Sequence, residues 1–296
     1  PKFDGFRCLA FRDGDEVDLR SKSGQPFNRY FPEVVAALAK LPARRFVLDG
    51  ELVVPEGDSL SFDELLMRIH PAASRVERLA REHPALMIVF DLLVDEKGTS
   101  LVSQTLSERR IALERFVKAN LKDGESRVRL APHTVERDAA NEWLNSLGSG
   151  LDGIIAKRRD LPYQTGERTG MQKWKRMRSA DCVVGGFRYA SKGEVVGSLL
   201  LGLYDDRGVL HHVGVTSSFT MAKRRQLVAE LEPLRAGSLD DHPWREWADA
   251  EAHASGRMPG GQSRWSAGKD MSWEPLRIER VCEVKYDHMQ GDRFRH

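Results

Sequence analysis

Apolar positions recur with a period of two in several stretches of the first 178 residues, and with a helical period between those stretches. Alternation over Phe6–Phe11 and Val17–Ser21, on either side of Asp13-Gly14-Asp15, predicts a β-hairpin. The other predicted strands cover Arg45–Val54, Leu86–Val94, Arg127–Pro132, Gly150–Lys157 and Met171–Arg178. Helices are predicted after Phe31-Pro32-Glu33, after the capping box Ser61-Phe62-Asp63-Glu64 and after a Ser107 cap, and over Ser74–Arg81 and Asp138–Leu147. This mixture predicts a layered α+β or α/β domain.

The pattern changes after Arg178, where strands predominate. Asp181–Tyr189 and Ser198–Thr216 read as strands, the second folded back at Asp205-Asp206-Arg207-Gly208, and Met221–Leu231 reads as the one interposed helix. The last strand pair is predicted over Arg280–Tyr286 and from Arg293 onward, and 235–269 reads as a long insertion loop. About five strands with one interposed helix predict a small β-barrel of the OB type. The expected boundary therefore gives domains 1–178 and 179–296.

Composition sets limits on the class of protein. With 41% apolar and 30% charged residues the chain should fold as an ordinary globular protein, and no apolar run approaches the roughly 20 residues that span a bilayer. The net charge of +2 leaves a nucleic-acid partner open, because any basic face must come from segregated charges. The three cysteines lack metal-site or disulfide spacing, so they are predicted to be buried apolar side chains in a reducing compartment.

Charged side chains inside apolar strands are the first sign of chemistry. Carboxylates occur in Asp49-Gly50-Glu51, Phe90-Asp91 and Asp152-Gly153, and each alone is more often a structural ion pair. Together with Lys2 and Asp4 they also suit a divalent ion. Lys173-Trp174-Lys175 would direct both ammonium groups to one face of a strand, which a solvated face also explains. Lysines beside acidic strands favour a bound polyphosphate.

Six short motifs occur in order: Lys-x-Asp-Gly-x-Arg at 2–7, Ser-Lys-Ser-Gly at 21–24, Asp-Gly-Glu at 49–51, Phe-Asp at 90–91, Asp-Gly-x-x-x-Lys at 152–157 and Lys-x-Lys at 173–175. This set resembles that of the covalent nucleotidyltransferases, and most closely the ATP-dependent DNA ligases. Arg29-Tyr30-Phe31-Pro32-Glu33, Tyr163-x-x-Gly-x-Arg168 and Val183-Val184-Gly185-Gly186-Phe187 are similar to the bacterial branch and its small LigC type. The resemblance implies an α+β adenylyltransferase (nucleotidyltransferase) domain followed by a C-terminal OB-fold β-barrel.

The resemblance also implies a reaction and its residues. Lys2 would attack the α-phosphate of ATP to form lysyl-AMP, pass AMP to the 5′-phosphate of a nick, and allow the 3′-hydroxyl to displace it. Such a lysine needs its ammonium form disfavoured, for which Lys157, Lys173, Lys175 and a bound metal are candidates. Arg7 and Glu51 would lie at the ribose, Phe90 on adenine, and the other lysines at phosphates. The implied ATP- or AMP-binding set is Lys2, Arg7, Lys22, Glu51, Phe90, Lys157, Arg168, Lys173 and Lys175.

The remaining implied sites bind metal and DNA. Mg²⁺ or Mn²⁺ would be held by Asp4, Glu51 and Asp152. Nicked duplex DNA would be held by Lys22, Arg188, Lys192, Lys223, Arg224 and Arg225, although ordinary solvated charge explains about half of the basic residues in the second domain. Lys22 stands where many relatives have Arg, which weakens bidentate grip on a phosphate, and Asp152 stands where many have Glu.

The expected setting is bacterial DNA repair in the cytoplasm, near the nucleoid, by a monomer without membrane contact. A DNA-end-binding repair protein is a candidate partner. The chain is expected to be a fragment, truncated before Lys2 and after the OB-domain strands, and therefore impaired in its own adenylylation by ATP. Two alternatives stay open: an RNA ligase or capping-type nucleotidyltransferase, and a noncatalytic nucleic-acid-binding OB protein.

Overall fold

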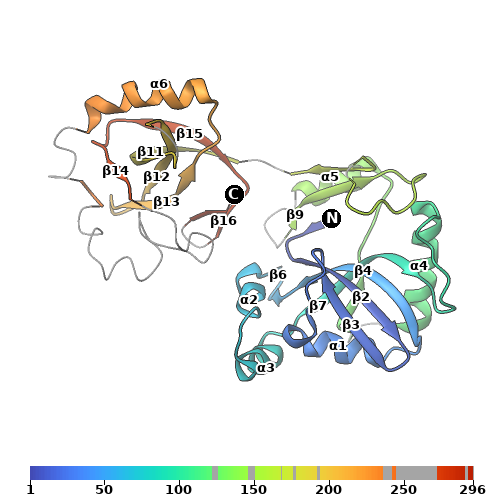
Figure 1. The fold of residues 1–296 in the computed structure, drawn as a ribbon. Coiled ribbons are helices and arrows are strands. Elements are labelled where there is room, and N and C mark those ends of the chain that lie inside the picture. Colours follow the sequence, from blue (N-terminus) through green and yellow to red (C-terminus); the bar gives the residue numbers. More distant parts are fainter. Residues whose placement is uncertain are drawn as a thin grey trace. The chain divides into compact units, whose positions relative to one another are not determined.

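The chain forms two compact units, Pro1–Arg176 and Met177–His296, each with its own core (Figure 1). The computed structural model describes residues 1–121, 126–145, 151–167, 169–175, 178–191, 194–235, 242–244, 272–290 and 293–295. The division falls beside the boundary expected between 178 and 179. Among the described residues, no helix has the length and apolar character to cross a membrane.

The first unit is built on a five-stranded sheet in the order β3-β2-β4-β7-β8, in which only β7 and β8 are parallel. Its strands are β2 (Phe6–Asp13), β3 (Glu16–Ser21), β4 (Arg45–Val53), β7 (Leu86–Val94) and β8 (Val128–Leu130). The predicted hairpin is confirmed, since Gly14 turns between β2 and β3 with φ of 63°, a conformation that glycine adopts at little cost. A side chain at Gly50 would place its Cβ 2.7 Å from the Ile88 carbonyl oxygen, so glycine lets β4 and β7 approach.

Helices cover this sheet and complete its core. They are η1 (Asn28–Tyr30), α1 (Pro32–Ala39), α2 (Phe62–Met67), α3 (Ala73–Glu82) and α4 (Leu106–Asn120). A further helix, α5 (Arg137–Asn145), instead contacts β9 (Leu151–Lys157) of a second sheet. α1 contacts β3 and α4 contacts β7 (Figure 1). Leu38 of α1 and Leu113 of α4 are buried in one cluster with strand residues. The predicted Ser107 cap is wrong. Thr105 caps α4 instead, because its side chain accepts from the Glu108 amide while the Glu108 carboxylate accepts from the Thr105 amide.

A second, small antiparallel sheet in the order β1-β9-β10 holds the start of the chain. It consists of β1 (Lys2–Phe3), β9 (Leu151–Lys157) and β10 (Met171–Trp174), and a two-stranded hairpin, β5 (Pro55–Glu56) with β6 (Ser59–Leu60), lies apart from it. The single strand predicted over Met171–Arg178 is wrong, because β10 ends at Trp174 and Arg178 begins the next strand. The pairing places Lys2 opposite Gly153, far away in sequence.

In its described residues, the second unit has a five-stranded antiparallel sheet and one long helix. Its elements are β11 (Arg178–Tyr189), β12 (Val196–Tyr204), β13 (Leu210–Thr216), α6 (Met221–Leu231), η2 (Glu232–Leu234), β14 (Glu274–Pro275), β15 (Val281–Tyr286), β16 (His288–Gln290) and β17 (Arg293–Arg295). β11 is long enough to pair with β12 along one edge and with β14 and β15 along the other. Leu227 and Leu231 of α6 pack into the core with Val184 and Phe187 of β11.

Trp244 is a core residue of the second unit. Its side chain is fully buried, its Nε1 donates to the Leu210 carbonyl at 2.9 Å, and its ring lies where a side chain at Gly185 would be. Most of the predicted insertion loop, including Trp247 and Trp265, lies outside the described residues. Of the cysteines, Cys8 and Cys182 are buried as predicted, whereas Cys282 is partly exposed.

Candidate functional site

Lys2 lies against the carboxylate of Asp152. Its Nζ is 2.5 Å from Asp152 Oδ2, and Lys175 Nζ is 3.7 Å from the same oxygen. The Lys2 and Asp152 side chains are only 17% and 13% exposed, so water screens this ion pair weakly. The small sheet and the residue that follows it thus bring together the first lysine, a β9 carboxylate and one lysine of the Lys-x-Lys motif. Their roles in catalysis and nucleotide binding stay a prediction.

Gly153 makes this arrangement possible. Its φ is 141°, and a Cβ there would lie 2.1 Å from the Trp174 carbonyl oxygen. Only glycine allows β9 and β10 to approach this closely beside Asp152.

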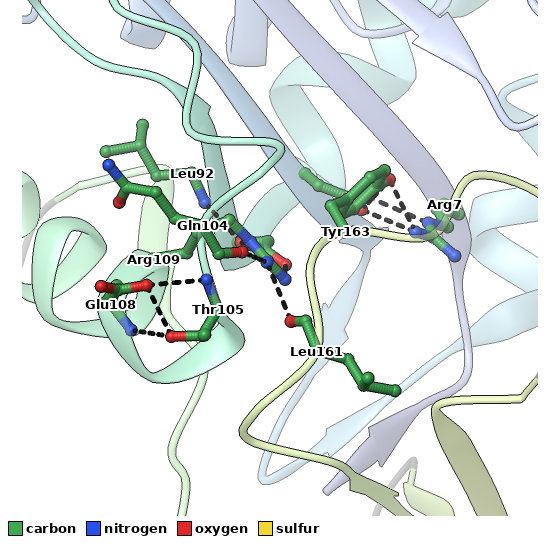
Figure 2. Close-up of polar contacts among 10 residues, drawn as sticks. Arg7, Leu92, Gln104, Thr105, Glu108, Arg109, Leu161 and Tyr163 are labelled. Carbon is green, nitrogen blue, oxygen red and sulfur yellow. Dashed lines mark hydrogen bonds and ion pairs between the residues drawn. The ribbon is translucent and has the colours of Figure 1, made fainter.

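Arg7 is held by a buried carboxylate on the neighbouring strand. Its Nε and Nη2 donate to the two oxygens of Asp49 at 3.0 and 2.6 Å, and the Tyr163 hydroxyl bonds to both partners (Figure 2). Burial alone would lower the pKa of the Arg7 guanidinium, but its hydrogen bonds with Asp49 and the charge of that carboxylate raise the pKa overall. Arg7 therefore keeps its charge and a fixed orientation.

Glu51 has no such partner. It pairs in register with Arg7 across β2 and β4, but its carboxylate makes no hydrogen bond or ion pair with any described residue. Burial raises the pKa of Glu51 to about 7, against the opposing charges of Lys2 and Arg7. Glu51, Arg7 and the exposed Lys22 line one depression of about 550 Å³, so three of the predicted nucleotide-binding residues share a surface.

Phe90 lies close to two cations. Lys157 Nζ is 4.5 Å from the ring centroid and Arg7 Cζ is 5.6 Å from it, which are cation–π distances. Burial lowers the pKa of Lys157, although the charges of Asp91 and Asp49 oppose that shift. The structure therefore gathers Phe90, Lys157 and Arg7, while stacking of Phe90 on adenine stays a prediction.

Two of the carboxylates noted in the sequence belong to ion pairs within the fold. Asp49 pairs with Arg7, and Asp91 receives Nε and Nη2 of Arg109 at 2.8 and 3.0 Å, with both side chains 3% exposed. Sequence reasoning missed Arg109. Its position four residues before Leu113, on the apolar face of α4, was the available signal, because a charge there must find a partner inside.

The predicted metal ligands are not assembled into one preformed centre. Within the described ranges, no three His, Cys, Asp or Glu side chains gather closely enough to hold a metal ion. Asp152 faces Lys2 and Lys175, while the charge of Asp4 is one of the smaller causes that raise the pKa of Glu51. The described side chains do not by themselves make a metal site, so Asp4, Glu51 and Asp152 as ligands stay a prediction.

The predicted DNA-contacting residues differ in what they already contact. Arg224 donates to the carbonyl oxygens of Val196, Gly197 and Ser217 at 2.6–2.9 Å, which favours a structural role. Lys223 pairs with Glu230 at 2.9 Å along α6, and Arg225 is exposed. Arg188 lies on β11, and Lys173 is exposed on β10. Arg168 and Lys192 lie outside the described residues.

Comparisons with known proteins agree along the chain. The family model "ATP dependent DNA ligase domain" matches residues 1–175, and "ATP dependent DNA ligase C terminal region" matches 192–296. DNA ligase C2 of Mycolicibacterium smegmatis is 51% identical and DNA ligase C of Mycobacterium tuberculosis 48% identical, each over the whole chain and 82% of the relative. A solved Lig E DNA ligase superposes with a TM-score of 0.53 at 21% identity, covering 76% of this chain and 78% of that one, which supports the fold.

Proposed function

Because this chain belongs to the family of ATP-dependent DNA ligases, we propose that it seals nicks between a 3′-hydroxyl and a 5′-phosphate in duplex DNA through a lysyl-AMP intermediate on Lys2, in bacterial DNA repair. The observation that carries the proposal is the ion pair of Lys2 with Asp152, with Lys175 beside it. These are the first, fifth and last of the six ordered motifs, drawn from distant parts of the chain.

Lys2 suits a nucleophile because its amine is held in one place. Forming the phosphoramidate bond requires the ammonium group to lose a proton and pyrophosphate to leave the α-phosphate. Asp152, at 2.5 Å from Nζ, fixes where the amine lies. Lys175, directly after β10, supplies a second positive charge beside Asp152, which would favour an approaching triphosphate.

The nucleotide would lie along the residues that gather near Arg7. Arg7 and Glu51 are assigned to its ribose side, Phe90 to the base, and Lys22, Lys157, Lys173 and Lys175 to phosphates. The shared depression of Arg7, Glu51 and Lys22 and the cation–π contacts of Phe90 support this assignment. Arg168 is assigned to a phosphate from its motif alone.

A divalent ion, Mg²⁺ or Mn²⁺, is proposed as the second cofactor beside ATP. When bound, it would neutralise phosphate charge. Asp4, Glu51 and Asp152 supply the oxygen ligands that such ions prefer, but they would need the nucleotide's own oxygens to complete a site.

Nicked duplex DNA is the proposed substrate, held by a subset of the exposed basic residues. Lys22 and Arg225 are exposed, whereas Arg188, Lys192 and Lys223 follow from composition and motif. The protein is further proposed to act as a monomer in the cytoplasm, near the nucleoid, with a DNA-end-binding repair protein as a partner.

The test is strand sealing by the protein at its full natural length. A singly nicked duplex with a labelled 5′-phosphate is incubated with Mg²⁺ and either ATP or GTP, beside a nicked RNA duplex. We expect a sealed strand from ATP and nicked DNA, and none from Lys2→Ala. A sealed strand with GTP but not with ATP, or with nicked RNA but not with nicked DNA, would contradict the proposal.

A further inference from the structure

Arg7, Asp49 and Tyr163 form a closed triangle of hydrogen bonds. Arg7 Nη2 donates to Asp49 Oδ2 at 2.6 Å and to the Tyr163 hydroxyl oxygen at 3.1 Å, and that hydroxyl donates to the same Asp49 oxygen at 2.8 Å (Figure 2). The tyrosine hydroxyl is therefore a donor to the carboxylate and an acceptor from the guanidinium. Asp49 is fully buried, so its charge depends on both partners.

The triangle leaves two N–H donors of Arg7 without a partner among the described residues. A guanidinium has five N–H groups, one on Nε and two on each terminal nitrogen. Nε bonds to Asp49 Oδ1, and the two on Nη2 are taken by Asp49 and Tyr163. The Nη1 pair has no partner among the described residues. Since the Arg7 side chain is 35% exposed and lines the depression beside Glu51, these two donors are open to a ligand.

Tyr163 is itself firmly anchored. Its amide donates to the Val102 carbonyl at 2.9 Å, and the Leu161 carbonyl accepts from the Leu106 amide at 2.9 Å at the start of α4. The Arg109 guanidinium, locked onto Asp91, lies 5.6 Å from the Tyr163 ring centroid. The hydroxyl is thus delivered to Arg7 from a fixed backbone. Burial raises the pKa of Tyr163 to about 12, so the hydroxyl keeps the proton that it donates to Asp49 at neutral pH.

We propose that Tyr163 is a positioning residue: its hydroxyl occupies the second N–H of Arg7 Nη2, fixes the guanidinium plane and leaves only the Nη1 pair to bind the nucleotide. Without the hydroxyl, the guanidinium can rotate about its link to Asp49 or turn Nη2 toward solvent, so fewer molecules present Nη1 correctly. This inference rests on the proposed nucleotide-binding role of Arg7.

The test compares Tyr163→Phe with wild type in lysyl-AMP formation from α-labelled ATP. Phenylalanine keeps the ring against Arg109 and removes only the hydroxyl. Hydrogen bonds to charged groups contribute more than neutral ones, so we expect KM for ATP to rise about 10-fold. Tm should fall modestly, because the buried Asp49 also loses one donor. Tyr30→Phe is the matched control, because Tyr30 lies in the same unit and its hydroxyl bonds to no described residue. It should keep the wild-type KM.

A double-mutant cycle separates positioning from general structure. Arg7→Lys keeps a cation beside the buried Asp49 but cannot make the forked contact. If Tyr163 acts through Arg7, adding Tyr163→Phe to Arg7→Lys should change KM by less than about 2-fold. The proposal would be overturned if KM is unchanged in Tyr163→Phe, with or without a fall in Tm. It would also be overturned if Tyr163→Phe raises KM about 10-fold in both the wild-type and the Arg7→Lys backgrounds. Failure of the wild-type protein to form lysyl-AMP would instead reject the proposed function.

Discussion

At the scale of single residues, the three carboxylates on β4 and β7 differ in their partners. Asp49 and Asp91 each receive a forked arginine and are buried, which offsets the cost of removing a charge from water. Glu51, two residues from Asp49 on β4, has charged neighbours but no bonded partner among the described residues. Two carboxylates therefore hold the fold together, and the third is available to a ligand.

Glu51 should make stability depend on pH. Its pKa is about 7 in the folded protein against an ordinary 4.5, so the folded state binds more protons between these values and the free energy of unfolding falls as pH rises through that window. In the wild type, the free energy of unfolding should therefore fall by an amount on the order of 2 kcal/mol between pH 5 and pH 8 because of Glu51, and Glu51→Gln should abolish this fall. Urea unfolding in EDTA checks this, with the exposed Glu56→Gln as control. An identical pH profile in Glu51→Gln and wild type would refute it.

At the scale of elements, α4 is joined to the sheet and to the segment before β10 by one side chain. Arg109 binds Asp91 of β7 with two nitrogens, and its guanidinium lies 5.6 Å from the ring centroid of Tyr163, in the segment before β10. Its Nη1 also donates to the Gln104 carbonyl at 2.7 Å. The capping box of Thr105 and Glu108 starts the helix immediately before it (Figure 2). This arrangement supports Tyr163 and, through it, Arg7.

Removing Arg109 should be severely destabilising. Arg109→Met leaves the Asp91 carboxylate buried without a cation, which costs about 3–5 kcal/mol. Arg115→Met, on the exposed side of the same helix, should cost less than about 0.5 kcal/mol. Denaturant unfolding measures both. Adding Asp91→Asn should recover part of the loss, and simple additivity of the two substitutions would argue against the pair.

The elements also show which features local sequence can predict. The hairpin at Asp13–Asp15 and the helix after Phe31 depend on turn residues and periodicity within a few positions, and both formed. The Ser107 cap failed because Thr105 has Glu108 three residues later and wins the reciprocal hydrogen bonds. The triangle of Arg7, Asp49 and Tyr163 could not be predicted, since its geometry joins three distant segments.

At the scale of the whole molecule, the predicted fold class is confirmed: an α+β adenylation domain is followed by an OB-type domain, and a family model matches each. The order of the six motifs was sufficient to predict this fold class from the sequence. Which basic residues of the second unit are structural could be told only from the structure. Arg224 and Arg225 are adjacent in sequence, but of the two only Arg224 donates hydrogen bonds to backbone carbonyls.

These adjacent arginines should behave oppositely. Arg224→Ala removes hydrogen bonds that tie α6 to β12 and should lower the stability of the second unit by about 2 kcal/mol. Arg225→Ala should leave stability unchanged, weaken nicked-duplex binding and reduce the slope of log K against log salt by about 1. Thermal unfolding and salt-dependent binding measure the two effects. Normal stability in Arg224→Ala would contradict the structural assignment.

The most direct test of the account is to locate the nucleotide on the protein. The full-length protein is incubated with α-labelled ATP and Mg²⁺, digested and mapped by mass spectrometry, then challenged with a singly nicked duplex. We predict one AMP adduct, on Lys2, that is discharged as the strand is sealed; it should be absent from Lys2→Ala and present in Lys40→Ala. An adduct on another lysine, or sealing by Lys2→Ala, would contradict the central claim.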